Sequence, residues 1–150
     1  QLGPINTYCD GSVLKYAKVY FEAYYNTIKE IKPTILGHYD LITKFSLMPE
    51  ENSTYIGFAK EILKENIKIC PVIEINTGAI SRGYRKTPYP IPALLKDIPS
   101  FGGKIILSSD SHQKENLQYG FNNSIALLKS IGINSVVELT KTGFVESPLN

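Results

Sequence analysis

Two segments of the chain carry apolar residues at the spacing of an amphipathic helix. In residues 12–32 apolar positions recur at steps of three and four, which predicts a helix with one buried stripe. The stripe comprises Val13, Ala17, Tyr20, Phe21, Tyr24, Ile28 and Ile31. Ser12 has the side chain of an N-cap, and Pro33 is expected to stop the helix. The same reasoning predicts a second helix over 53–66, capped by Ser53.

Short apolar runs alternate with these helices and predict strands. The runs cover residues 34–37, 71–75, 104–108 and 135–139, and a terminal strand or hairpin is expected at 144–145. Shorter helices are predicted over 92–98, with Pro92 in the first turn, and from a cap at Asn123 or Ser124 to Gly132. This alternation implies βαβ units and a parallel sheet, which is an α/β fold. Functional groups of such folds collect beyond the carboxyl ends of the strands.

Composition and charge exclude several classes of protein. A length of 150 residues indicates one domain or part of a larger one, and a net charge of +2 is too small for nucleic-acid binding by bulk electrostatics. No apolar run approaches the roughly 20 residues that span a bilayer, and no signal peptide is visible, so we expect no membrane partner. Cys9 and Cys70 lack zinc-finger partners, so we predict buried free thiols in a reducing compartment, the cytoplasm.

The two histidines of the chain each follow a predicted strand and lie near an aspartate. His38 comes after the run 34–37 with Asp40 behind it, whereas His112 follows the run 104–108 with Asp110 ahead of it. If the strands are parallel neighbours, both histidines lie on one rim, where imidazole and carboxylate groups could bind Zn, Mn or Fe. For either histidine alone, a structural role as a hydrogen-bonded residue is the alternative.

The long loop over 76–90 carries a second candidate function. Arg82 and Arg85 suit bidentate binding of a phosphate, and Gly78 and Gly83 allow the backbone to approach an anion closely. Long ordered loops are usually functional. A solvated basic loop is the alternative interpretation.

Four stretches in succession resemble motifs of the histidinol phosphatases of the PHP family. Gly37-His38-Tyr39-Asp40-Leu41 resembles the third family motif, and Ser108-Ser109-Asp110-Ser111-His112 resembles the fourth. Between them, Glu74-Ile75-Asn76-Thr77-Gly78, then Arg82-Gly83 and Pro88-Tyr89-Pro90, are similar to a further conserved stretch. Downstream, Tyr119-Gly120-Phe121 also fits the family, and the resemblance extends from about residue 8 to the end of the chain.

The resemblance implies a fold, a reaction and a cofactor. Members of the family have a distorted (β/α)7 barrel related to the TIM barrel. They hold up to three divalent Zn, Mn or Fe ions at the carboxyl rim and hydrolyse a small phosphate monoester, L-histidinol phosphate, in histidine biosynthesis. We therefore expect residues 1–150 to be the carboxyl-terminal part of one such phosphatase domain.

Roles for individual residues also follow from the resemblance. By motif, His38, Asp110 and His112 would be metal ligands. Arg82 would contact the phosphate, and Asp40 would orient a ligand or contact the substrate amine. Arg85 and Asn76 are further candidates for substrate binding, whereas neither Glu74 nor Asn76 is expected to bind metal.

The chain also departs from the family pattern. The first motif, His-x-His, and the second motif with its Glu and His are absent, so we expect catalysis to need an amino-terminal half that completes the barrel. Two alternatives stay open: a PHP phosphoesterase with another substrate, and a truncated fragment without catalytic activity.

Overall fold

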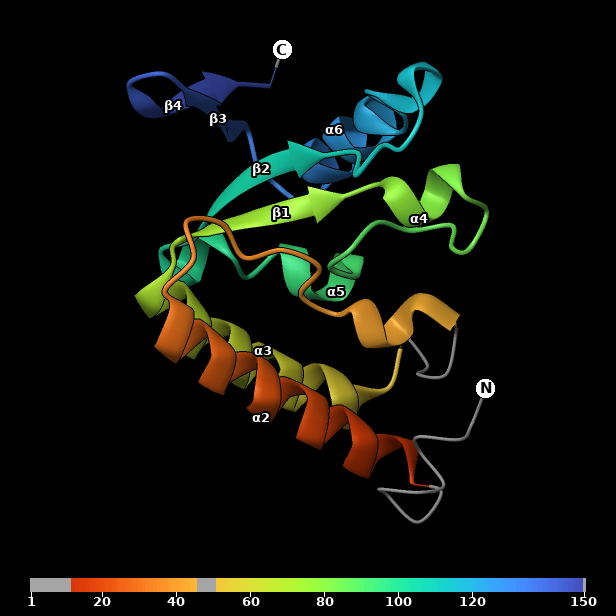
Figure 1. Cartoon of the computed structure of the whole chain (residues 1–150), viewed down its shortest axis with the longest axis vertical. Coiled ribbons are helices and arrows are strands. Elements are labelled where there is room, and N and C mark those ends of the chain that lie inside the picture. The colour runs from red at the N-terminus through yellow and green to blue at the C-terminus, as the bar shows by residue number, and fades with distance from the viewer. Residues whose placement is uncertain (1–11, 46–50, 150) are drawn as a thin grey trace.

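The computed structural model describes residues 12–45 and 51–149, which form helices and two small sheets (Figure 1). In Figure 1 the helices α2 (Val13–Ile31) and α3 (Ser53–Ile69) lie side by side below the strands, and α6 (Phe121–Ser130) lies above β1 (Val72–Asn76) and β2 (Lys104–Ser108). The expected α/β class is therefore confirmed. The prediction made for Cys9 concerns a residue outside the described ranges.

The parallel strands set the position of the loops that follow them. β1 (Val72–Asn76) and β2 (Lys104–Ser108) form a two-stranded parallel sheet, close to the expected bounds. The strand expected at 34–37 is reduced to one parallel bridge, from Leu36 to Ile73. Because all three segments run in the same direction, the residues that follow them meet at one edge of the sheet.

The carboxyl-terminal strands form a separate hairpin. β3 (Ser135–Thr140) pairs antiparallel with β4 (Gly143–Pro148), which confirms the hairpin expected near the end of the chain. β3 lies beside β2 without joining its sheet, and only Val136 and Val137 of β3 are buried. Within the described ranges the strands form no closed barrel.

Helix α2 begins and ends where its sequence predicts. The Ser12 side chain accepts a hydrogen bond from the Lys15 amide at 3.2 Å, as an N-cap does. Lys32 closes the helix in a left-handed conformation with φ 49°, directly before Pro33. The helix buries Ala17, Phe21 and Ile28 from the predicted stripe.

The helix α3 begins at Ser53 as expected, but the predicted cap is wrong by one residue. Asn52, not Ser53, is the N-cap: its backbone is extended and its side-chain oxygen accepts from the Tyr55 amide at 2.9 Å. Both residue types favour caps, so composition did not separate them. The helix continues past residue 66 to Ile69, because Asn66 and Ile67 still face the core.

The start predicted for α6 is also wrong. The helix begins at Phe121 after Gly120, which has φ 77°, and no side chain caps it. Ser124 is therefore a buried helical residue instead of a cap, and Asn123 also lies inside the helix. The expected end is confirmed, because Gly132 adopts φ 85° directly after the last turn.

Short helices fill the connections. They are η1 (Leu41–Phe45), α4 (Gly78–Ser81), α5 (Pro92–Leu95), η2 (Pro99–Phe101) and η3 (Lys114–Asn116). The long loop after β1 therefore contains the turn α4, and the helix predicted over 92–98 ends early, at Leu95.

The core lies between the helix pair and the strands. The Phe21 ring packs against Tyr39 and Tyr55, with ring centroids 5.1 and 5.8 Å apart. Cys70 is a buried free thiol, as expected. None of the described helices is both long and apolar enough to cross a bilayer.

The position of the α3 cap is testable. Replacement of Asn52 by Ala removes the hydrogen bond to the Tyr55 amide and should lower the free energy of unfolding by about 1 kcal/mol in chemical denaturation. Ser53→Ala is the matched control, because Ser53 is exposed and already helical. A larger loss from the Ser53 variant than from the Asn52 variant would restore Ser53 as the cap.

Candidate functional site

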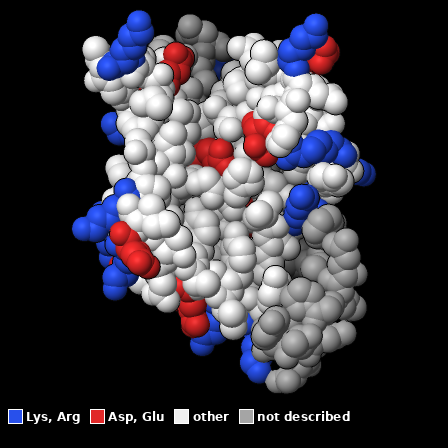
Figure 2. All heavy atoms as spheres, in the orientation of Figure 1, with Lys and Arg blue, Asp and Glu red and all other residues white. Residues whose placement is uncertain are grey.

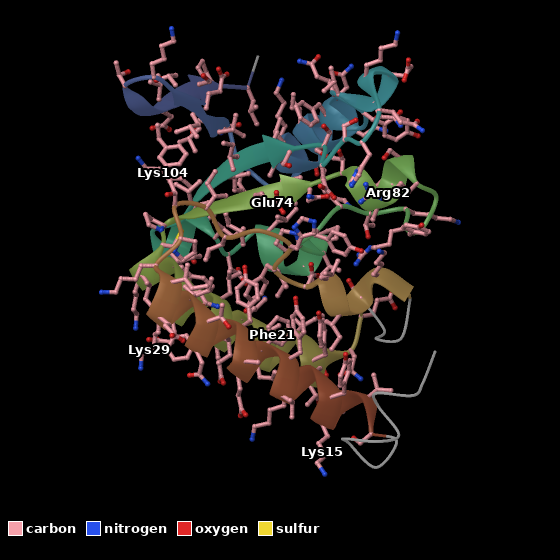
Figure 3. The ribbon with its side chains drawn as sticks, viewed as in Figure 1. Lys15, Phe21, Lys29, Glu74, Arg82 and Lys104 are labelled. Carbon is pink, nitrogen blue, oxygen red and sulfur yellow. The ribbon has the colours of Figure 1, made fainter. Side chains whose placement is uncertain are left out.

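The strand ends bring the predicted metal ligands to one rim. His38 follows the Leu36 bridge, and Asp110 follows β2. His38 Nε2 lies 3.4 Å from Asp110 Oδ2. Figure 3 shows Arg82 at the carboxyl end of β1 and Lys104 at the opposite end of the sheet, which marks the rim. The expectation that the two loops meet is confirmed.

Glu74 holds His38 at both its backbone and its ring. Glu74 Oε1 accepts from the His38 amide at 2.7 Å and lies 3.0 Å from His38 Nδ1. Asn76 Nδ2 donates to the same oxygen at 3.2 Å. In the protonated imidazole, Nδ1 donates to Glu74 and Nε2 donates to Asp110. In the neutral form with its proton on Nδ1, Nε2 instead carries a lone pair that could bind a cation.

The same contacts shift the ionisation of both groups. The hydrogen bond to Glu74 raises the pKa of His38, against an opposing effect of burial. Burial by itself would raise the pKa of Glu74, but its hydrogen bonds from the His38 ring and amide outweigh burial and lower it. The pair therefore favours a charged carboxylate beside the imidazole.

Asp110 is the junction between β2 and the loop after β1. Arg82 Nη2 donates to Asp110 Oδ2 at 3.0 Å, and Arg82 Nη1 donates to the Asp110 carbonyl at 3.1 Å. Although partial burial opposes ionisation, the hydrogen bonds from Arg82 and His38 lower the pKa of Asp110. Asp110 therefore stays a carboxylate that faces both His38 and Arg82.

Both candidate ligands adopt a backbone conformation that is uncommon for residues other than glycine. His38 has φ 51° and Asp110 has φ 45°. Such residues cost free energy, persist when the surroundings hold them, and cluster at functional sites. Apart from Lys32 at the end of α2, these are the described residues other than glycine that have a positive φ, and their side chains meet.

His112 approaches the site through its Nδ1 atom. This atom lies 2.9 Å from the Asp110 carbonyl and 3.2 Å from Arg82 Nη1. Across residues 12–45 and 51–149, no three His, Cys, Asp or Glu side chains are placed to hold one metal ion together. The structure thus brings His38 and Asp110 together, and His112 as a ligand stays a prediction.

A cavity of about 330 Å³, here called the rim cavity, opens over these residues. It is lined by His38, Leu41, Lys44, Ala79, Arg82, Tyr84, Tyr89, Asp110 and His112. Figure 2 shows basic and acidic side chains next to each other on this face, over α4 and the end of β2. Lys44 Nζ lies 4.9 Å from the centroid of the Tyr84 ring and adds a second cation to the wall.

An adjoining cavity of about 350 Å³, the side cavity, shares three residues with the rim cavity. It is lined by Ser81, Arg82, Tyr84, His112, Gln113 and Asn116. Arg82 therefore lies between the rim cavity, which contains His38 and Asp110, and the side cavity, whose walls also include the uncharged polar residues Ser81, Gln113 and Asn116.

Three residues expected at the site lie outside the walls of the rim cavity. Asp40 is fully buried and accepts from the Ile91 amide at 2.9 Å. The buried Arg85 stacks on Tyr89 with its guanidinium carbon 4.6 Å from the ring centroid. Asn76 is also buried and supports Glu74. Their expected roles in catalysis or substrate binding stay predictions, and this geometry gives them structural contacts.

Sequence reasoning missed several residues of the cavity wall. Lys44 and Tyr84 line the rim cavity although neither was singled out, and Tyr89, which was named only within a stretch that resembles the family, lines it too. Lys44 lies in the 3-10 helix that directly follows the His38 turn, so its closeness to His38 in the sequence was the one signal that could have placed it at the site.

The chain is similar to a curated protein described as "Probable histidinol-phosphatase" from Schizosaccharomyces pombe (strain 972 / ATCC 24843). The two are 32% identical over 129 residues, which cover 81% of this chain and 41% of that protein. This chain is related to a histidinol-phosphatase-like protein. It spans about two fifths of the length of that relative, and no family model matches it.

Gly78 makes the junction of the two loops possible. A Cβ atom at this position would lie 2.9 Å from the Ser109 carbonyl oxygen and 3.0 Å from Asp110 Cβ, with Arg82 Nη2 at 2.8 Å. Such contacts are too short, so a side chain would force the β1 and β2 loops apart.

Gly78→Ala should therefore destabilise the chain by about 1–3 kcal/mol, as overpacking does, and should shift the amide resonance of Asp110 in NMR spectra. Gly57→Ala is the control, because this exposed helical glycine has open space around it and the change should be neutral or stabilising by up to about 1 kcal/mol. Equal stability of the two variants would contradict the close approach.

Proposed function

We propose that this chain is part of a metal-dependent phosphomonoester hydrolase that converts L-histidinol phosphate and water to L-histidinol and phosphate. The observation that carries the proposal is the meeting of His38 and Asp110 beside Arg82 in one cavity. The similarity to the probable histidinol-phosphatase supports the choice of reaction and substrate. In the whole protein, we propose, further strands complete a (β/α)7 barrel of the PHP type.

The donor atoms present are compatible with a divalent metal ion. Zinc binds imidazole nitrogen and carboxylate oxygen at about 2.0–2.2 Å, so two ligands at a tetrahedral angle are separated by about 3.4 Å. The Nε2 atom of His38 and Oδ2 of Asp110 are 3.4 Å apart. Glu74 supplies the carboxylate behind the imidazole that metal-bound histidines usually have.

Two converging donors do not complete a catalytic site. His112 lies next to Arg82, and we propose that it becomes a further ligand when its ring rotates away from Arg82. The site would hold up to three Zn, Mn or Fe ions, and we propose that its remaining ligands come from residues outside this chain. Within the described residues no three His, Cys, Asp or Glu side chains are placed to hold one ion together.

The residues of the rim cavity have distinct tasks in such a hydrolysis. A divalent ion bound by His38 and Asp110 would supply Lewis-acid polarisation of the phosphoryl group. Arg82 has a planar guanidinium that can bind two phosphate oxygens, and Lys44 offers a second positive charge on the same cavity wall. These cations stabilise the negative charge on the transferred phosphoryl group.

A different phosphomonoester is the second candidate substrate. The side cavity next to Arg82 is lined by uncharged polar groups of Ser81, Gln113 and Asn116, which do not by themselves select an imidazole-bearing alcohol. Comparison of L-histidinol phosphate with a panel of small phosphomonoesters distinguishes the two candidates, because only a histidinol phosphatase should prefer the first.

Metal dependence is the first test of the proposal. The full-length protein should release phosphate from L-histidinol phosphate, lose this activity after exhaustive chelation, and regain it when Mn²⁺ or Zn²⁺ is returned. Phosphate release is the measurement, and a His112→Ala variant should show a strongly reduced rate. Turnover that is undiminished in the absence of metal would rule out the proposed chemistry.

The carboxylate behind His38 gives a second test. Glu74→Gln keeps the shape of the side chain but removes the charge that holds the imidazole, so it should weaken Mn²⁺ or Zn²⁺ binding about 10–100-fold by calorimetry. Glu138→Gln removes the same charge from an exposed position on β3 and should leave the affinity unchanged. Equal affinities for the two variants would show that Glu74 does not act through a metal ligand.

A further inference from the structure

Three consecutive carbonyl groups around His38 each accept a hydrogen bond from a tyrosine of helix α2. Tyr24 Oη donates to the Gly37 carbonyl at 2.8 Å. Tyr20 Oη lies 3.2 Å from the His38 carbonyl and 3.1 Å from the Tyr39 carbonyl, as the shared donor to both. The turn is therefore held from below by two phenols and from the side of the sheet by Glu74.

The two phenols are well placed for a common task. Tyr20 and Tyr24 are one helical turn apart, so they lie on the same face of α2, and their ring centroids are 6.2 Å apart. Tyr24 also packs edge to face against Tyr39, at 5.3 Å between centroids. Phe21, which lies between them in the sequence, is fully buried and packs α2 against the core. The two phenol rings are thus held in place by ring contacts beneath the His38 turn.

His38 is the residue that needs such support. Its φ of 51° is uncommon for a histidine, and a strained backbone persists only when the surroundings over-determine it. The Glu74 contacts fix its amide and its Nδ1 atom, whereas the carbonyl side of the turn is fixed by Tyr20 and Tyr24. Without the hydrogen bonds from Tyr20 and Tyr24 the turn can relax, and His38 Nε2 then no longer points toward Asp110.

We propose that Tyr20 and Tyr24 are positioning residues, whose hydroxyl groups hold the left-handed turn at His38 and so aim its imidazole at the rim cavity. They line neither the rim cavity nor the side cavity, so they act through His38 and not on the substrate. The consequence for metal binding rests on the proposed function, whereas the consequence for the imidazole itself does not.

The test uses phenylalanine substitutions in the full-length protein. Tyr20→Phe, Tyr24→Phe and the double variant each remove hydroxyl donors and keep the rings that pack in the core. Tyr25→Phe is the matched control on the same helix: its ring lies under Lys29 Nζ at 5.6 Å, and its hydroxyl makes no hydrogen bond to any described residue. The single variants each keep one phenol, so they remain informative if the double variant does not fold.

Two measurements separate positioning from a merely structural role. The imidazole resonances of His38, assigned with a His38→Gln variant, report its tautomer and surroundings in the metal-free chain. Calorimetry with Mn²⁺ or Zn²⁺ reports the affinity of the site. We expect the Tyr20 and Tyr24 variants to shift the His38 resonances and weaken metal binding roughly ten-fold, with the Tyr25 variant like the unmodified chain.

The outcomes distinguish this inference from the proposed function. Unchanged His38 resonances in both single variants would overturn the positioning role, whatever the metal affinity. Displaced resonances support it, even if the unmodified full-length protein binds no Mn²⁺ or Zn²⁺. In that last case the metal site proposed above fails, but the resonances still decide whether the phenols position His38.

Discussion

The carboxylate of Glu74 is the contact on which the geometry of the rim depends. It lies within β1, yet it bonds the amide and the ring of His38, which belongs to a segment attached to that strand by a single bridge. Burial of an unpaired carboxylate would be costly, so Glu74 and the His38 turn stabilise one another. The site is therefore built into the edge of the sheet.

A second constraint joins the other side of the rim. Gly78 leaves room for the Asp110 loop to pass close to α4, and Arg82 then closes the gap with two hydrogen bonds to Asp110. The contact with Glu74 positions the imidazole of His38, and the contacts with Arg82 position the carboxylate of Asp110. These two groups then lie 3.4 Å apart. Arg82 thus has two potential partners, Asp110 in this structure and an anionic ligand in the proposed reaction.

Much of the local structure could be predicted from the sequence, because it depends on neighbouring residues. The stripe, cap and end of α2 follow from periodicity, Ser12 and Pro33, and the bounds of β2 follow from one apolar run. The cap of α3 could not be predicted because Asn52 and Ser53 both have suitable side chains. The start of α6 could not be predicted because no side chain caps that helix. The hairpin at the end was expected, but its separation from the parallel sheet was not.

The sequence by itself determined which chemistry the rim can offer: two histidines and an aspartate that follow strands, and an arginine on the loop between them. Parallel strand direction then made their meeting predictable. Only the tertiary structure decided which partners each group has, because hydrogen bonds between residues far apart in the chain depend on packing. It buried Asp40 and Arg85, set Glu74 behind His38, and placed the phenols of α2 under the turn.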